Sequence, residues 1–344
     1  MMKTSDFDYH LPSELIAQTP IEIRDQSRLL VLNKQDGSIE HRKFNDIIEY
    51  LNNRDVLVFN NSRVIPARLK GKRVDTGGSV ELLLLRKLDD GTWQTLVKPG
   101  KRVRQDTMIE ISDSKTGKTV RAEVVDSGEG GTRIIGFSDN SLLPDLGEVP
   151  LPPYIHTHLD DPERYQTVYA EPEGSAAAPT AGLHFTRKML QIISDRGVTR
   201  LFTTLHIGLD TFRPVKEENP QEHIIHSEYG ILDDRTASEI RKAKGEGRRV
   251  ICVGTTSVRL VEAAAQNSDD GKIKPYEGWV DLYILPGYRF KIADVMITNF
   301  HLPRSTLIMM VSAFAGTENI KKAYRIAVEN KYRFYSFGDA MLIL

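Results

Sequence analysis

The sequence predicts a discontinuous α/β main domain that carries an inserted, small, all-β domain resembling a barrel. From about residue 151 onward, strand-like and helix-like runs alternate, and residues 1–60 share this texture, which is typical of α/β domains. Residues 62–150 instead hold short β-branched runs separated by DDG, SKTGK and SGEGG, which are turn-forming. We therefore predict an α/β catalytic domain of residues 1–61 plus 151–344 and a β-barrel domain of residues 62–150.

Residues 1–60 and 62–150 differ in the elements that they predict. The first segment combines a helix-like run, FNDIIEYLN, with the strand-like runs RLLVLN and DVLVFN. The inserted segment has five strand-like runs, a number that suits a small barrel or sandwich: VELLLLRKL, TWQTLVK, TMIEIS, KTVRAEVV and TRIIGF. PLPPY at 150–154 marks the return to the main domain.

The last segment predicts helices and strands in alternation. TRKMLQIISDRG reads as a helix capped by Thr186 and ended by Gly197. Strands are expected at VTRLFTTLHI, RRVICVG and DVMITNF, with a last strand at YRFYSF. Helices are expected at RTASEIRKAKGEG, TSVRLVEAAAQ, STLIMMVSAFAG and ENIKKAYRIAVEN.

The composition is that of an ordinary globular protein, with 344 residues, 40% hydrophobic and 27% charged. The longest apolar run, 307–315, is too short to span a bilayer. The single cysteine, Cys252, excludes an internal disulfide and a cysteine-rich zinc site. We expect a cytoplasmic protein without a membrane segment.

The charge is unevenly distributed along the chain. Residues 60–104 contain eleven Lys and Arg against four Asp and Glu, a local net charge of +7 within a chain of net charge −1. Such an asymmetry indicates a basic face for a polyanion, and the alternative is a solvated basic surface without a partner.

Three histidines lie among small and polar residues between Gly174 and Glu228. His184 lies in GSAAAPTAGLHFT, His206 in TTLHIGLDTFRPV and His226 in HIIHSE. Small residues let the backbone approach a ligand, and histidine moves protons near neutral pH. We predict that the three segments line one pocket, although each ring could instead cap or pack an element.

Two further segments have the order strand, polar residues, helix. VGTTSVRL resembles a turn that holds an anion, but it matches neither GxxxxGK[ST] nor GxGxxG. Thr255, Thr256 and Ser257 could bind a carboxylate or a ribose hydroxyl, or could simply cap a helix. TNFHLPRST repeats the pattern, and the glycine turn in YSFGDAML carries aromatic residues.

Metal binding is not expected. His223 and His226 are three residues apart, which on a helix would put both on one face, but HIIHSEYGIL alternates as a strand does. His156 and His158 lie in the linker and have no better partners.

Taken together, seven segments resemble the S-adenosylmethionine:tRNA ribosyltransferase-isomerases of queuosine biosynthesis from about residue 4 to 343. They are DYHLPSELIAQTP, FNNSRVIPARL, AAPTAGLHFT, TLHIGLDTFRPV, VGTTSVRLVE, TNFHLPRSTL and YSFGDAMLI. The resemblance implies transfer of the ribosyl part of S-adenosylmethionine to 7-aminomethyl-7-deazaguanine at the tRNA wobble position. Epoxyqueuosine-tRNA, adenine and methionine are the implied products. S-Adenosylmethionine is then a substrate, with no prosthetic group and no metal, and we expect a monomer.

That chemistry requires proton transfers and carboxylates near a ribose that gains positive charge. The candidate catalytic residues are His184, His206, Asp210, His226 and Glu228. The candidate substrate-binding residues are Thr180, Gly182, Thr255, Thr256, Ser257, Arg259, Asn299 and His301. The candidate tRNA-binding residues are Arg63, Arg68, Lys98, Lys101, Arg102 and Arg104.

Three alternatives make different predictions. A tRNA methyltransferase would release S-adenosylhomocysteine, but no GxGxG loop follows an early strand. A non-catalytic tRNA-binding protein would not require S-adenosylmethionine, and a metallohydrolase using His223 and His226 would lose activity on chelation.

Overall fold

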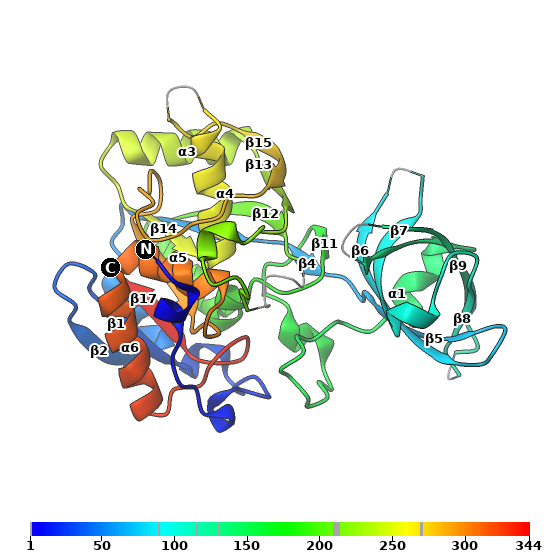
Figure 1. The fold of residues 1–344 in the computed structure, drawn as a ribbon. Helices are drawn as coiled ribbons and strands as arrows, with labels where there is room; N and C mark the ends of the chain where they lie inside the picture. Colours follow the sequence, from blue (N-terminus) through cyan, green and yellow to red (C-terminus); the bar gives the residue numbers. More distant parts are fainter. Residues whose placement is uncertain (1, 89, 115, 129–130, 209–213, 269–270) are drawn as a thin grey trace. The chain divides into compact units, whose positions relative to one another are not determined.

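The computed structural model describes all residues except 1, 89, 115, 129–130, 209–213 and 269–270. The chain forms two compact units (Figure 1). The main unit comprises Met1–Arg63, Pro152–Pro172 and Ala178–Leu344, and the barrel unit comprises Val64–Leu151 and Glu173–Ala177. The second unit is thus inserted into the first, which confirms the predicted fold class.

A nine-stranded mixed sheet runs through the main unit, in the order β15-β13-β12-β3-β14-β16-β17-β1-β2. Four adjacent strands are parallel: β12 (Thr199–His206), β3 (Val56–Asn60), β14 (Val250–Val253) and β16 (Val295–Asn299). The others are β1 (Arg28–Leu32), β2 (Ile39–Lys43), β13 (Glu228–Leu232), β15 (Tyr276–Val280) and β17 (Ala340–Ile343). β3, β14 and β16 are buried at every residue, as expected for parallel strands covered on both faces.

Helices cover both faces of this sheet. One apolar core includes residues of α3 (Asp234–Gly245), α4 (Thr255–Gln266), α5 (Thr306–Ala315) and α6 (Thr317–Glu329). The opposite core includes residues of α2 (Arg187–Asp195) and of the 3₁₀ helix Phe44–Tyr50. The result is a three-layer α/β unit.

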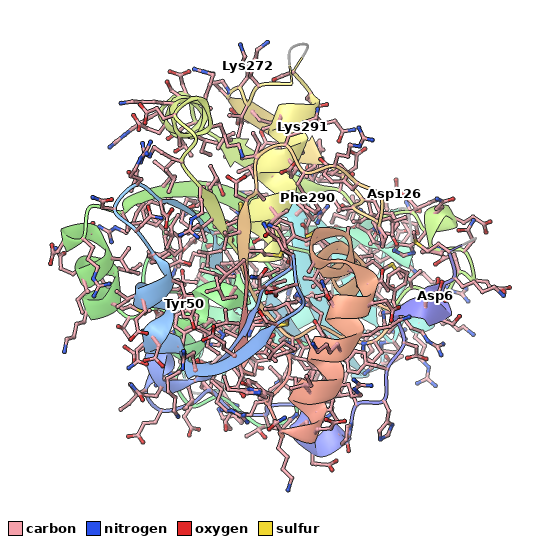
Figure 2. The ribbon with its side chains drawn as sticks, turned by 90° about the vertical axis from the view of Figure 1, so that its left-hand side faces the viewer. Asp6, Tyr50, Asp126, Lys272, Phe290 and Lys291 are labelled. Atoms are coloured by element: carbon pink, nitrogen blue, oxygen red, sulfur yellow. The ribbon has the colours of Figure 1, made fainter. Side chains whose placement is uncertain are left out.

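The loop before β16 is fixed to α4 by a buried carboxylate. Glu262 accepts the backbone N–H groups of Lys291, Ile292 and Ala293, each at 2.9 Å. Figure 2 shows Phe290 and Lys291 beside this helix. Phe290 also packs edge-on against Phe314 of α5, with ring centroids 4.9 Å apart.

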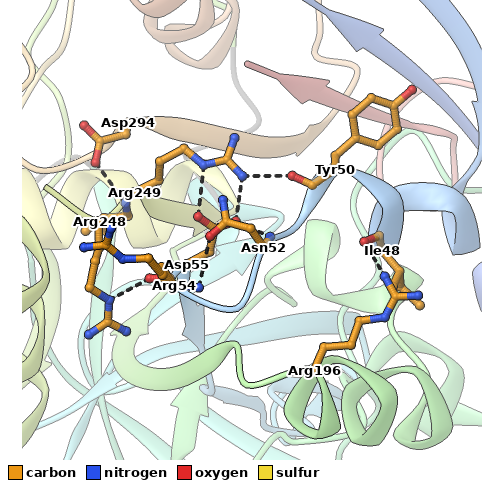
Figure 3. Close-up of polar contacts among 10 residues, drawn as sticks. Ile48, Tyr50, Asn52, Arg54, Asp55, Arg196, Arg248, Arg249 and Asp294 are labelled. Carbon is orange, nitrogen blue, oxygen red and sulfur yellow. Dashed lines mark hydrogen bonds and ion pairs between the residues drawn. The ribbon is translucent and has the colours of Figure 1, made fainter.

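A second polar network lies where the parallel strands begin (Figure 3). Asp55 accepts two hydrogen bonds from Arg249, at 2.9 and 2.6 Å, and Arg249 also donates to the Tyr50 carbonyl at 2.9 Å. Asp294 accepts the Val250 N–H at 2.9 Å. These bonds hold the amino ends of β3 and β14.

The barrel unit is a closed six-stranded barrel in the order β10-β7-β6-β5-β8-β9. Its strands are β5 (Arg68–Arg73), β6 (Ser79–Lys87), β7 (Trp93–Lys98), β8 (Met108–Ser112), β9 (Thr119–Ser127) and β10 (Arg133–Phe137). Along β8, buried and exposed residues alternate, because one face of each strand points into the barrel. The short helix α1 (Leu143–Leu146) follows, and β4 (Arg63–Val64) pairs with β11 (Glu173–Ser175) in a separate two-stranded sheet.

Most predicted elements are present, with two differences. Thr186 caps α2 as expected, accepting the Met189 N–H at 3.1 Å, and Gly197 follows the helix at a positive φ of 84°. The last strand is β17 and not YRFYSF, because the chain turns sharply at Tyr335 and Gly338. FNDIIEYLN forms a 3₁₀ helix. Among the described residues, no helix is long and apolar enough to cross a bilayer.

Candidate functional site

A pocket lies in the main unit, next to the ends of β14 and β16, and encloses about 600 Å³ of space that includes open solvent. In open α/β sheets, ligands bind outside the carboxyl ends of parallel strands. We call it the strand-end pocket. It is lined by Tyr154, Ala178, Pro179, Thr180, Ala181, Ile207, Gly254, Thr255, Thr256, Thr298, Asn299, Phe300, His301, Leu302, Ser305, Leu307, Tyr335 and Ser336.

The turn between β14 and α4 forms one wall. Gly254 has a φ of 90°, a conformation that glycine adopts without strain, and the helix begins at the next residue. Thr256, in the first turn, is 7% exposed, and its buried Oγ1 has no hydrogen-bond partner within the described part of the chain. The first N–H groups of a helix also have no partner within the helix. This wall therefore offers unused hydrogen-bonding groups to a ligand.

Asn299, the last residue of β16, offers a second unused group. Its Nδ2 donates to the Tyr335 carbonyl at 3.0 Å and lies 3.2 Å from Nε2 of His184. Its Oδ1 is buried and has no hydrogen-bond partner among the residues that the structure describes. Buried polar atoms are nearly always paired, so an unpaired oxygen in a pocket indicates a place for a ligand donor.

His184 lies behind Asn299 and does not line the strand-end pocket. Its Nδ1 is 2.7 Å from Ser27 Oγ, and its ring stacks on Phe44 with centroids 4.9 Å apart. Burial, reinforced by Arg24 and Arg333, lowers its pKa to about 3. The ring is therefore neutral at physiological pH.

His301 is also neutral and lines the pocket. Burial lowers its pKa to about 3, and its Nε2 is 2.7 Å from Thr298 Oγ1. Its backbone is held on both sides, since the N–H donates to Tyr324 at 3.0 Å and the carbonyl accepts from Tyr9 at 2.5 Å.

Two tyrosines that were not among the candidate residues complete the pocket. The rings of Tyr154 and Tyr335 have centroids 4.7 Å apart. Tyr335 has a φ of 69°, which is unusual for a bulky residue and is a form of strain that occurs at functional sites. The aromatic residues in YSFGDAML were the sequence signal for Tyr335, whereas Tyr154 lies in the linker run PLPPY.

His206 ends β12, beside the pocket residue Ile207. Asn60 fixes this end of the strand through two hydrogen bonds with the Leu205 backbone, at 2.9 and 3.0 Å. The His206 ring is half-buried, its pKa is lowered by burial, and its Nδ1 has no partner among the described residues. His206 therefore presents a neutral ring with an unused nitrogen.

Glu228 and Arg259 form a buried ion pair outside the pocket lining. Glu228 Oε2 is 2.5 Å from Arg259 Nη1, and the side chains are only 3% and 4% exposed. Arg259 also donates to the Leu282 and Val280 carbonyls, and Glu228 accepts the Gly208 N–H at 3.0 Å. The pair thus joins β13, α4 and the segment that follows His206.

The other candidate residues of the main unit lie apart from the pocket lining. His226 is exposed. Ser257 donates to the carbonyl of Val253, the last residue of β14, at 2.9 Å. Gly182 packs so closely that a Cβ would lie 2.0 Å from the Tyr169 hydroxyl. Asp210 lies outside the described residues. Thr180, Thr255, Thr256, Asn299 and His301 do line the pocket.

The candidate tRNA-binding residues fall into two groups. Arg63 pairs with Glu163, and Arg68 lies 3.6 Å from Glu81. The other four, Lys98, Lys101, Arg102 and Arg104, are exposed. Within the part of the chain that the structure describes, none of these four forms an ion pair. Arg133 fixes their turn by donating to the Gly100 and Val103 carbonyls, at 3.2 and 3.0 Å.

His223 contacts the Glu217 carboxylate at 2.9 Å through Nδ1. No group of three or more His, Cys, Asp or Glu residues arranged to hold a metal occurs among the described residues.

Comparisons with known proteins cover essentially the whole chain. The family described as "Queuosine biosynthesis protein" matches residues 4–343. The chain is 57% identical over 343 residues to the S-adenosylmethionine:tRNA ribosyltransferase-isomerase of Dehalococcoides mccartyi (strain CBDB1), with 100% of each chain covered. It is 54% identical over 346 residues to the protein of that name in Clostridioides difficile (strain 630), covering 99% of this chain and 100% of the relative.

A solved structure agrees with these relatives. The crystal structure of S-adenosylmethionine tRNA ribosyltransferase from Thermotoga maritima is 39% identical to this chain, with a TM-score of 0.58. The match covers 99% of this chain and 100% of that one. The chain therefore belongs to the queuosine biosynthesis protein family.

Proposed function

We propose that this protein is an S-adenosylmethionine:tRNA ribosyltransferase-isomerase. It transfers the ribosyl unit of S-adenosylmethionine to the amine of 7-aminomethyl-7-deazaguanine at the tRNA wobble position. The C1′–N bond to adenine and the C5′–S bond to methionine break, a C–N bond forms between the amine and the ribosyl unit, and the ribosyl carbons close to the epoxide-bearing ring of epoxyqueuosine. One C5′ proton and one amine proton are lost; adenine takes up one proton and the other is released. The full-length relatives that bear this name, at 54–57% identity, support the assignment.

The observation that carries the site assignment is the pair of unpartnered oxygens, Thr256 Oγ1 and Asn299 Oδ1, at the strand-end pocket. The pocket lies outside the carboxyl ends of β14 and β16, where ligands of open α/β sheets bind. We assign the start of α4 to the methionine carboxylate, since helix N-termini favour anions. We assign Asn299 to a donor on the adenosyl part, which can offer an amine or ribose hydroxyls.

His206 is our candidate for the general base. S-Adenosylmethionine has acidic C5′ protons beside its sulfonium, and the attacking amine must also lose a proton. A neutral histidine with an unused nitrogen can accept a proton, and lowering of its pKa by burial keeps it in the basic form at pH 7.

The exposed cations at 98–104 are our candidate tRNA contact on the barrel unit. An anticodon arm presents phosphates and unstacked bases, and cations that form no ion pairs with the described protein residues can bind phosphates without first breaking such contacts. We further propose that the protein acts as a monomer in the cytoplasm.

Product identification tests the proposed reaction. The protein is incubated with S-adenosylmethionine and tRNA carrying the aminomethyl-deazaguanine base, and the small molecules are separated by chromatography. Equal amounts of adenine and methionine, matched by modified tRNA, are expected. S-Adenosylhomocysteine would instead indicate a methyltransferase, and unchanged S-adenosylmethionine with bound tRNA would indicate a non-catalytic binding protein.

A further inference from the structure

We infer that His184 is a positioning residue: together with Ser27, it holds the Asn299 amide so that Oδ1 faces the strand-end pocket as a hydrogen-bond acceptor. This inference rests on the proposed function for the identity of the ligand, S-adenosylmethionine. It assigns His184 the positioning of Asn299 in place of the proton transfer that the sequence predicted for it.

The first observation is that both ring nitrogens of His184 are already occupied. Nδ1 lies 2.7 Å from Ser27 Oγ and Nε2 lies 3.2 Å from Asn299 Nδ2. The residue is 4% exposed and stacks on Phe44. Neither nitrogen is available to reach a substrate.

The direction of each hydrogen bond from Asn299 through His184 to Ser27 follows from the Tyr335 carbonyl. The Tyr335 carbonyl can only accept, so the group of Asn299 that lies 3.0 Å from it must be the amide NH₂. That NH₂ therefore also donates to Nε2 of His184, and the remaining ring proton lies on Nδ1. Nδ1–H donates to Ser27 Oγ, whose hydroxyl donates to the Arg24 carbonyl at 3.3 Å.

The consequence concerns the other end of Asn299. With its NH₂ held by two acceptors, the amide presents Oδ1, which is buried and has no partner in the described part of the chain. An acceptor at this position selects an N–H or O–H donor and disfavours a carbonyl or carboxylate. The adenine amine and the ribose hydroxyls of S-adenosylmethionine meet this requirement. The depressed pKa of His184 agrees with a ring that stays neutral and keeps one tautomer.

The test compares His184→Gln with His184→Ala. The terminal amide of Gln can place an oxygen near the position of Nε2 and accept from Asn299, but it cannot transfer a proton at neutral pH. We expect His184→Ala to weaken S-adenosylmethionine binding about tenfold, the effect of one hydrogen bond, and His184→Gln to bind within about threefold of wild type. Calorimetric titration without tRNA measures both, and His223→Gln is the matched control, with wild-type affinity expected.

Turnover measurements distinguish a positioning role of His184 from a role in proton transfer. His184→Gln should retain most of kcat, with the wild-type pH profile, while His184→Ala raises KM for S-adenosylmethionine more than it lowers kcat. Wild-type affinity in both variants together with lost turnover would overturn the inference and make His184 a proton-transfer residue. If His184→Ala does not fold, Ser27→Ala replaces it, with about threefold weaker binding expected and unchanged binding counting against the inference. Failure of the proposed reaction would appear separately, as absence of adenine release by the wild-type protein.

Discussion

The side-chain oxygens of Thr256 and Asn299 are buried and have no hydrogen-bond partner among the described residues. Leaving such an atom unsatisfied costs about 1–3 kcal/mol, a cost that is common at functional sites. We therefore expect each oxygen to contribute more to the free energy of ligand binding than to the free energy of folding.

Replacing Thr256 with Val separates these two contributions. The change removes a hydroxyl that has no hydrogen-bond partner among the described residues, so the free energy of unfolding should stay within about 1 kcal/mol of wild type or rise. Affinity for S-adenosylmethionine should fall about tenfold through loss of one hydrogen bond. Calorimetric titration and urea denaturation measure the two effects.

Thr167→Val is the matched control. Thr167 is 4% exposed, its Oγ1 likewise has no hydrogen-bond partner among the described residues, and it does not line the strand-end pocket. It should bind S-adenosylmethionine as wild type does. Equal loss of affinity in both variants would remove Thr256 from the binding site.

His206 gives a prediction for the pH dependence of turnover. Burial lowers its pKa from 6.5, so the ring becomes protonated, and inactive as a base, only when pH falls below that value. kcat/KM should therefore be level near pH 7 and decline at a pH below 6.5. His206→Ala should lose about 10²- to 10⁴-fold in kcat and lose this acid limb, while His158→Ala, an exposed linker residue, serves as control. An unchanged acid limb in His206→Ala would show that another group is the base.

At the scale of residues, the sequence indicated which residues line the strand-end pocket better than it indicated the role of each residue. Thr180, Thr255, Thr256, Asn299 and His301 line the strand-end pocket, and local pattern predicted strand ends and helix starts around them; their part in binding stays a prediction. Ser27 is 157 residues from His184, and no local pattern reports such a contact. The pairing of Glu228 with Arg259 likewise depends on how β13 packs on α4.

At the scale of elements, the Glu228–Arg259 pair connects three parts of the main unit. Arg259 lies on α4, Glu228 begins β13, and the Val280 carbonyl that accepts from Arg259 ends β15. Removing one partner of a buried pair leaves an uncompensated charge. The pair therefore positions elements and does not itself line the pocket.

Glu228→Gln should lower the free energy of unfolding by about 3–5 kcal/mol. The double variant Glu228→Met/Arg259→Met should recover much of this loss, because no buried charge remains. Asp8→Asn, which breaks the exposed Asp8–Arg304 pair, should cost less than about 1 kcal/mol. Urea denaturation followed through Trp279 in a Trp93→Phe background measures the main unit alone. Wild-type stability of Glu228→Gln with lost turnover would instead favour a catalytic carboxylate.

Elements with strong local signals were predicted best. The continuous apolar runs of β3 and β14 and the capped helix α2 are present where the sequence placed them. The aromatic run YRFYSF has strand-like composition but forms a turn, because Tyr335 takes a left-handed conformation and Asp339 accepts the Arg28 and Arg333 N–H groups. Such tertiary contacts override local preference.

At the scale of the whole molecule, the two units differ in the chemistry that they present. The main unit has a pocket with neutral hydrogen-bonding groups, whereas the barrel unit has an exposed basic turn. Phosphate contacts confer strong salt dependence on nucleic-acid binding. The two substrates should therefore respond differently to ionic strength.

Replacing Lys101, Arg102 and Arg104 with Ala should weaken tRNA binding. The slope of log affinity against log salt should fall by roughly two to three, for about three lost phosphate contacts. The matched control replaces Lys70, Arg73 and Lys118, whose charges are paired with Glu148, Asp75 and Asp145, and should change the slope by less than about one. An equal fall in both variants would mean that tRNA responds to net charge and not to this turn.

A crystal structure with bound S-adenosylmethionine tests most directly whether the strand-end pocket is the donor site. We expect the ligand to donate to Asn299 Oδ1 at about 3 Å and to bond Thr256 Oγ1 at a similar distance, with its carboxylate at the start of α4. Ligand bound elsewhere, with Asn299 Oδ1 and Thr256 Oγ1 still unpartnered, would contradict this assignment.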